Sequence, residues 1–460
     1  MTERVVFHVG SPKSGTTYLQ RLLRDNVHAL GERGILVAGE RHRELVHAAM
    51  LVREDPRAAK QTPHARGAWD RLVAQIAEYD GHTAVISYEL FSVATAEQAE
   101  RALAALAPAT VELVVTSRDL GSALTSAWQE RLKFKLTTPL GEWTPPAEEK
   151  VRSEWGWRSL DPAGVLERWG ATLPAERRHL VTVPRGAAPD LLWSRFCEAA
   201  GLGLLPVIAE GGRRNSSMGA APAEVLRRVN AALGDRLDTG AEQIRWTRDL
   251  LANTVLADPG LDGSAPPDPI TLPPSLRTEA TERYARMTRR LDALGVTVHG
   301  DLADLDPDPH LDPAVSPTGD GGAAPGRLPE EVPDADVAAA AVTALADLLA
   351  TLRERERAQE RAATPADHTP PADVVPTGVR HRLREVLGRG VHTEVEYLHR
   401  RVDELQDQLF QARSLQHELA EVTDIVAELL LPAQQRDDER VREAIRGYRQ
   451  ASLRNPAGEG

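Results

Sequence analysis

A glycine-containing segment near the N-terminus has the residue types and spacing of a phosphate-binding loop. Residues 10–17 read Gly-Ser-Pro-Lys-Ser-Gly-Thr-Thr, directly after the β-rich run Val5–Val9, and helical spacing of leucines begins at Thr17. A loop between a strand and a helix offers unpaired backbone N–H groups and the positive end of the helix dipole, which together favour an anion. The segment therefore predicts a phosphate site.

The position of the lysine in this loop separates it from the loops of nucleoside triphosphatases. In those loops the lysine directly follows the second glycine, whereas Lys13 lies two residues before Gly15. No acidic residue stands at an obvious later strand end to hold magnesium. The pattern speaks against a kinase of nucleosides or small metabolites, which is the first alternative function.

A second pair of candidate residues follows the apolar run Val111–Thr116. Arg118 would leave the end of this strand as a fork of donors suited to phosphate oxygens, and Ser126, eight residues later, would add a hydroxyl from the next helix. Taken alone, Arg118 and Asp119 are typical of a surface ion pair. Considered together with the upstream loop, Arg118 and Ser126 indicate a binding site for a second phosphate.

With both elements, the sequence resembles the sulfotransferase superfamily over residues 1–305, because Pro-Lys-Ser-Gly-Thr-Thr at 12–17 matches its signature. The resemblance implies transfer of a sulfuryl group from 3′-phosphoadenosine 5′-phosphosulfate (PAPS) to a hydroxyl, or less readily an amine, with no metal. Lys13 would contact the oxygen that bridges phosphate and sulfate, and Arg118 and Ser126 would bind the 3′-phosphate. The residues that it assigns to the 5′-phosphate are Ser14, Gly15, Thr16 and Thr17. The acceptor stays open: a carbohydrate, a lipid or a small metabolite.

An acceptor hydroxyl loses its proton as it attacks sulfur, so a general base is expected near the strand ends. Glu89 follows the run Thr83–Ser87, and its surroundings are similar to those in the sulfotransferase branch that uses a glutamate base. His42 and His47, on an expected helix, are second candidates. The alternative for Glu89 is a carboxylate in a helix cap or an ion pair.

Other polar residues are assigned by their surroundings. The charged residues Glu130 and Lys133 are candidates for the lining of the acceptor cleft, and the alternative is a solvated helix end. We expect His8, which alternates with apolar neighbours, to be a buried structural residue. Arg213 and Arg214 are candidates for a basic loop over the nucleotide, although the family's usual Arg-Lys-Gly form is absent there.

The elements that must position these residues alternate along the first 305 residues. Helical segments separate the apolar runs, a pattern that predicts a parallel sheet covered on both faces. The fold class is α/β: a three-layer α/β/α P-loop-type domain with a central parallel sheet. The strand-like runs are Val5–Val9, Thr83–Ser87, Val111–Thr116 and Leu180–Val183, and a mostly helical region after them ends in a short run at Val296–Val298.

Beyond Leu305 the composition changes. Residues 306–335 are rich in Pro, Gly and Asp and predict a disordered linker, and residues 336–363 predict a helix. A Pro-rich linker at 364–378 precedes an expected coiled coil at 379–431 and a tail at 432–460. Apolar residues alternate three and four apart from Val395 to Leu419, which favours a homodimer, whereas packing on the globular domain is the alternative. A non-catalytic scaffold built on this coiled coil is the second alternative function.

Composition narrows the class of protein further. The 460 residues carry 55 basic and 68 acidic side chains, a net charge of −13 that argues against broad nucleic-acid binding. The single Cys197 rules out an intramolecular disulfide framework and a thiolate-rich zinc site. With no secretory or 18-residue apolar run apparent, we expect a soluble cytoplasmic protein without an integral membrane segment.

Overall fold

A computed structural model of the chain describes residues 2–39, 42–148, 156–185, 189–203, 218–237, 240–256, 269–307 and 326–363. The chain divides into two compact units, Met1–Thr364 and Pro365–Gly460, and every described residue belongs to the first. The Pro-rich linker, the predicted coiled coil and the tail lie outside the described residues, as do Arg213 and Arg214.

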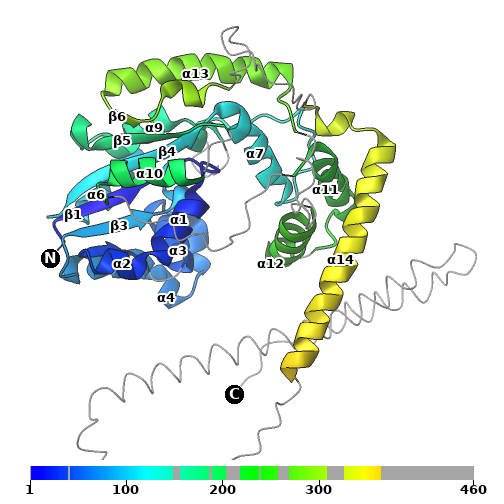
Figure 1. Cartoon of the computed structure of the whole chain (residues 1–460), viewed down its shortest axis with the longest axis horizontal. Coiled ribbons are helices and arrows are strands. Elements are labelled where there is room, and N and C mark those ends of the chain that lie inside the picture. Colours follow the sequence, from blue (N-terminus) through cyan, green and yellow to red (C-terminus); the bar gives the residue numbers. More distant parts are fainter. Residues whose placement is uncertain are drawn as a thin grey trace, which may run out of the picture. The chain divides into compact units, whose positions relative to one another are not determined.

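Six parallel strands form the centre of the first unit, in the order β2-β3-β1-β4-β5-β6 (Figure 1). Four of them were predicted. β2 and β6 have only three residues each, too few for a recognisable pattern, although β6 falls on the short run Val296–Val298. The strands are β1 (Arg4–His8), β2 (Ile35–Val37), β3 (Thr83–Ser87), β4 (Thr110–Arg118), β5 (Arg178–Val183) and β6 (Thr297–His299).

Helices cover both faces of the sheet, because successive strand residues point to opposite sides and both sides are apolar. Val6 packs with α1 (Thr16–Asp25), α2 (Val27–Gly31) and α10 (Pro189–Ala200) on one face. The other core holds Phe7 with α3 (His42–Val52), α5 (Ala68–Glu78), α6 (Ala96–Ala104), α7 (Leu120–Leu132), α9 (Pro162–Gly170), α11 (Ala220–Leu233) and α13 (Pro274–Leu294). The predicted three-layer α/β/α class is therefore confirmed.

Shorter elements connect these layers, together with a π-helix and one long C-terminal helix. They are η1 (Pro56–Lys60), α4 (Pro63–Arg66), η2 (Glu89–Val93), α8 (Trp157–Leu160), η3 (Ala175–Arg177), α12 (Gly240–Glu242), the π-helix η4 (Gln243–Leu256), η5 (Leu302–Leu305), η7 (Pro329–Glu331) and α14 (Asp334–Ala363).

The strand order creates a switch point beside β1. From β1 the chain continues to β2 on one side of the sheet, and from β4, the neighbour of β1, it continues to β5 on the other. In open parallel sheets ligands bind outside the carboxyl ends of the strands at such a point. The predicted phosphate loop follows β1 and Arg118 ends β4, so the topology brings both to the switch point.

Helix α14 belongs to the same compact unit as the sheet. Val337 and Ala344 are buried where α14 packs against α11 and η4 (Figure 1), so the compact unit continues past Leu305, where composition alone placed its end. Residues 334–358 are also long and apolar enough to cross a membrane by length and composition, a criterion that core helices and signal sequences of other proteins also meet. The absence of a membrane segment stays a prediction.

Candidate functional site

The predicted phosphate loop is bound to the neighbouring strand and held in a tight conformation. The backbone N–H of Ser11 donates to the Thr116 carbonyl of β4 at 2.8 Å. Lys13 and Gly15 both adopt the left-handed backbone region, with φ of 67° and 86°. A Cβ on Gly15 would also lie 2.4 Å from Leu192 Cδ2, so this position requires glycine for both reasons.

The start of α1 presents backbone donors to an incoming anion. Within the described part of the chain, no acceptor pairs with the N–H groups of Gly15, Thr16 or Thr17, as expected for the first turn of a helix. The Thr17 side chain is exposed, whereas Thr16 is buried. The Ser14 hydroxyl is also buried and donates to the Ser11 carbonyl at 2.7 Å. Backbone N–H groups and Thr17 are therefore the open donors of this loop.

Lys13 reaches a buried carboxylate on α7. Its Nζ lies 3.5 Å from Glu130 Oε2, and the Lys133 Nζ lies 3.2 Å from the same oxygen. The Glu130 and Lys133 side chains are only 14% and 12% exposed, so the alternative of a solvated helix end is wrong. Burial opposes ionisation of Glu130, but the two lysines outweigh it and lower its pKa. Burial also lowers the pKa of Lys133.

Arg118 ends β4 as predicted and forms an ion pair with Asp119. Its buried Nε has no hydrogen-bond acceptor among the described residues and lies 3.6 Å from Asp119 Oδ2, beyond hydrogen-bond distance. Asp119 caps α7 and accepts from Arg185 at 2.5 Å. Arg185, just after β5, was not singled out in the sequence, although its place after a strand end was a usable signal. Ser126 is buried on α7.

Glu89 opens η2 at the end of β3, and its partner comes from α1. The Gln20 amide donates to Glu89 Oε2 at 2.9 Å, so the helix that begins with the phosphate loop also orients this carboxylate. Gln20 is buried and was missed in the sequence, where a glutamine on an amphipathic helix carries no distinguishing pattern.

Two arginines hold the far end of η2 in place. Arg168 donates to the carbonyls of Ser92 and Ala94, and Arg158 donates to those of Val93 and Ala94. Burial lowers the pKa of Arg168 to about 10, so it stays charged at neutral pH. The short segment that carries Glu89 is therefore anchored at both ends.

The structure brings together Lys13, Glu89 and Arg118 at the carboxyl ends of three adjacent strands, β1, β3 and β4. His42 begins α3, and its side chain lies outside the described part of the structure. His47, on α3, has a pKa lowered by burial and by Arg43. In the described part of the chain, His47 makes no hydrogen bond to the other candidates.

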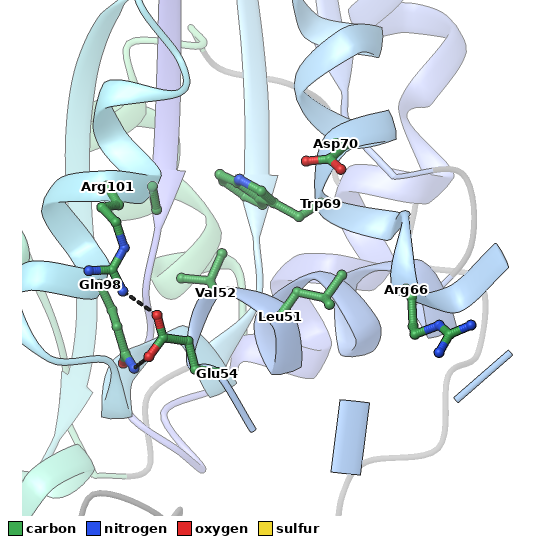
Figure 2. A pocket seen from close by; sticks show the side chains of 9 residues that line it. Leu51, Val52, Glu54, Arg66, Trp69, Asp70, Gln98 and Arg101 are labelled. Carbon is green, nitrogen blue, oxygen red and sulfur yellow. Dashed lines mark hydrogen bonds and ion pairs between the residues drawn. The ribbon is translucent and has the colours of Figure 1, made fainter. Parts of the chain in front are cut away.

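Two small pockets lie elsewhere in the unit. Figure 2 shows one of about 230 Å³ between α3, α5 and α6, lined by residues that include Trp69 and Leu51, with Glu54 joined to Arg101. The other, about 220 Å³, lies beside the arginines of α13. None of the predicted site residues lines either pocket. Within the described ranges, no group of three or more His, Cys, Asp or Glu side chains could hold a metal ion.

Two of the comparisons with known proteins gave a match. Residues 398–452 match a family model described as a domain of unknown function, DUF6752. No curated protein matches. A solved structure of a sulfotransferase from Alicyclobacillus acidocaldarius is similar at 15% identity and a TM-score of 0.32, and the match covers 53% of this chain and 99% of that one. At this level of similarity, the reaction has to be inferred from the site residues themselves.

Proposed function

We propose that the protein is a sulfotransferase that moves a sulfuryl group from PAPS to a hydroxyl, or less readily an amine, of a carbohydrate, lipid or small-metabolite acceptor. The observation that carries the proposal is that two cationic residues lie at the ends of adjacent strands, at the switch point. Lys13 lies in the loop after β1, and Arg118, whose Nε has no hydrogen-bond acceptor among the described residues, ends the adjacent β4. Together they suit a substrate with phosphate groups at two positions.

Lys13 acts on the leaving group in this proposal. As the bond between sulfur and the bridging oxygen breaks, its electron pair stays on the 5′-phosphate of the leaving adenosine 3′,5′-bisphosphate. An ammonium placed beside that oxygen stabilises charge that develops only in the transition state. The unpaired N–H groups of Gly15, Thr16 and Thr17 bind the same phosphate, and Arg118 with Ser126 binds the 3′-phosphate.

Glu89 is the proposed base. The attacking acceptor oxygen forms its bond to sulfur opposite the leaving oxygen, and its proton passes to the Glu89 carboxylate. Glu130 is a poorer candidate because it lies 3.5 Å from Lys13 and thus on the leaving-group side. Its lowered pKa also makes it a weaker base. His42 and His47 stay second candidates.

Transfer of radiolabelled sulfate tests the proposal. Purified protein is incubated with PAPS labelled in its sulfuryl group and with fractionated cell extracts, and labelled products are separated and identified. We expect transfer to a hydroxyl-bearing compound, and its loss in Lys13→Ala. Lys60→Ala, an exposed lysine on η1, is the matched control and should transfer normally. Equal transfer by wild type and Lys13→Ala would contradict the role of the lysine.

A further inference from the structure

A buried chain of hydrogen bonds runs from the end of β3 to the phosphate loop. His8 Nδ1 lies 2.8 Å from Ser87 Oγ, and His8 Nε2 lies 3.1 Å from Thr116 Oγ1. Thr116 Oγ1 in turn lies 2.7 Å from Ser14 Oγ, which donates to the Ser11 carbonyl at 2.7 Å. All five residues are less than 5% exposed. The chain joins three adjacent strands to the loop.

The hydrogen bond from Ser14 to the Ser11 carbonyl fixes the donor and the acceptor in each of the other bonds of this chain. Ser14 has one hydroxyl proton and gives it to the Ser11 carbonyl, so Ser14 Oγ accepts from Thr116. The single proton of Thr116 is then used, so Thr116 Oγ1 accepts from His8 Nε2–H. Burial lowers the pKa of His8 to about 3. Its ring is therefore neutral, and Nδ1 accepts from Ser87 Oγ–H.

We propose that His8, in its neutral Nε2–H tautomer, is a positioning residue of the phosphate loop that acts through Thr116 and Ser14. The chain of donors fixes the Ser14 side chain and, with it, the turn that presents the loop N–H groups. The Thr116 carbonyl, which accepts from Ser11 N–H, is a second tie to the same loop. This assigns a functional role to a histidine that the sequence indicated only as structural.

Gly10 shows how closely the loop is fitted to this chain. A Cβ on Gly10 would lie 2.6 Å from Thr116 Oγ1 and 3.2 Å from His8 Nε2. Only a residue without a side chain lets the backbone pass over the two groups. The ring of Phe196, edge-on to His8 at 5.0 Å between centroids, covers the histidine from α10. The loop backbone and the hydrogen-bond chain therefore form one packed unit.

Nuclear magnetic resonance on the wild-type protein tests the tautomer directly. Long-range proton–nitrogen spectra distinguish a protonated ring nitrogen from an unprotonated one. The direction of the chain predicts a protonated Nε2 and an unprotonated Nδ1 for His8 at neutral pH. The opposite tautomer, or a doubly protonated ring, would overturn the proposal.

Substitution of Thr116 tests the effect on the loop. Thr116→Val removes the central hydroxyl at nearly constant volume, Thr116→Ser keeps it, and Thr182→Val removes another buried threonine hydroxyl, on β5. We expect Thr116→Val to weaken binding of adenosine 3′,5′-bisphosphate about tenfold, the size of one or two lost hydrogen bonds, with near wild-type affinity in the other two variants. Equal affinity in Thr116→Val and Thr182→Val would overturn the proposal.

The affinity measurement rests on the proposed function, so amide hydrogen exchange provides an independent readout. Thr116→Val should speed exchange at the amides of Ser11 and Ser14, which donate to the carbonyls of Thr116 and Ser11, whereas Thr182→Val should not. If wild-type protein binds no bisphosphate, the donor assignment fails while the exchange result still decides the role of the chain. Unchanged exchange in Thr116→Val would then count against it.

Discussion

Because His8 is buried and neutral, we predict that the free energy of unfolding falls in mild acid. The pKa of His8 is about 3 in the folded protein and about 6.5 when the chain is unfolded. Below pH 6.5 the unfolded state takes up a proton that the folded state does not, so the free energy of unfolding falls as the pH falls. Between pH 7 and pH 5 the loss attributable to this one group is about 2 kcal/mol.

The assay is urea unfolding of wild type and His8→Gln at several values between pH 7 and pH 5. Other histidines with lowered pKa values, such as His47 and His299, contribute in the same direction in both proteins. The difference between the two slopes isolates His8. We expect the variant to lose about 2 kcal/mol less than wild type over this range. Parallel slopes would refute a buried neutral His8, as would titration of its ring signals between pH 8 and pH 5 should the variant not fold.

Three further substitutions test neighbouring parts of the site. Glu130→Gln removes the negative charge between Lys13 and Lys133, so calorimetry at low salt should show bisphosphate binding tightened by about 1 kcal/mol, roughly fivefold; weaker binding would contradict this. Gln20→Leu frees Glu89, and transfer assays should show a lower kcat with bisphosphate affinity unchanged; an unchanged kcat would exclude the orienting role. Arg168→Met leaves buried carbonyls without donors, so urea unfolding should show a loss of about 2–4 kcal/mol; a smaller loss than for an exposed arginine would refute it.

The sequence was sufficient for the loop and the sheet because these depend on local patterns. Lys13 and Arg118 stand next to apolar runs that are buried on both faces, and such runs are strands in a parallel sheet. The strand β2, with three residues, and the continuation of the unit into α14 depend on packing between distant segments. Periodicity within one segment carries no information on such contacts.

The partners of the site residues were harder to predict. Glu130 looks like one more charged residue at a helix end, and only the fold places Lys13 beside it. Only the fold likewise places Gln20 beside Glu89, and Arg185 beside Asp119 at the end of another strand. Side chains that meet across adjacent strands leave no spacing rule in a single sequence.

Calorimetric titration with adenosine 3′,5′-bisphosphate and with AMP tests the central claim most directly. The two ligands differ only in the 3′-phosphate, which Arg118 and Ser126 are proposed to bind. Charge-assisted bonds of about 1.5–3 kcal/mol predict at least tenfold tighter binding of the bisphosphate by wild type. Arg118→Ala should lose this preference and retain its affinity for AMP. Equal affinity of the wild-type protein for the two ligands would contradict the proposal that this site binds a 3′-phosphorylated sulfuryl donor.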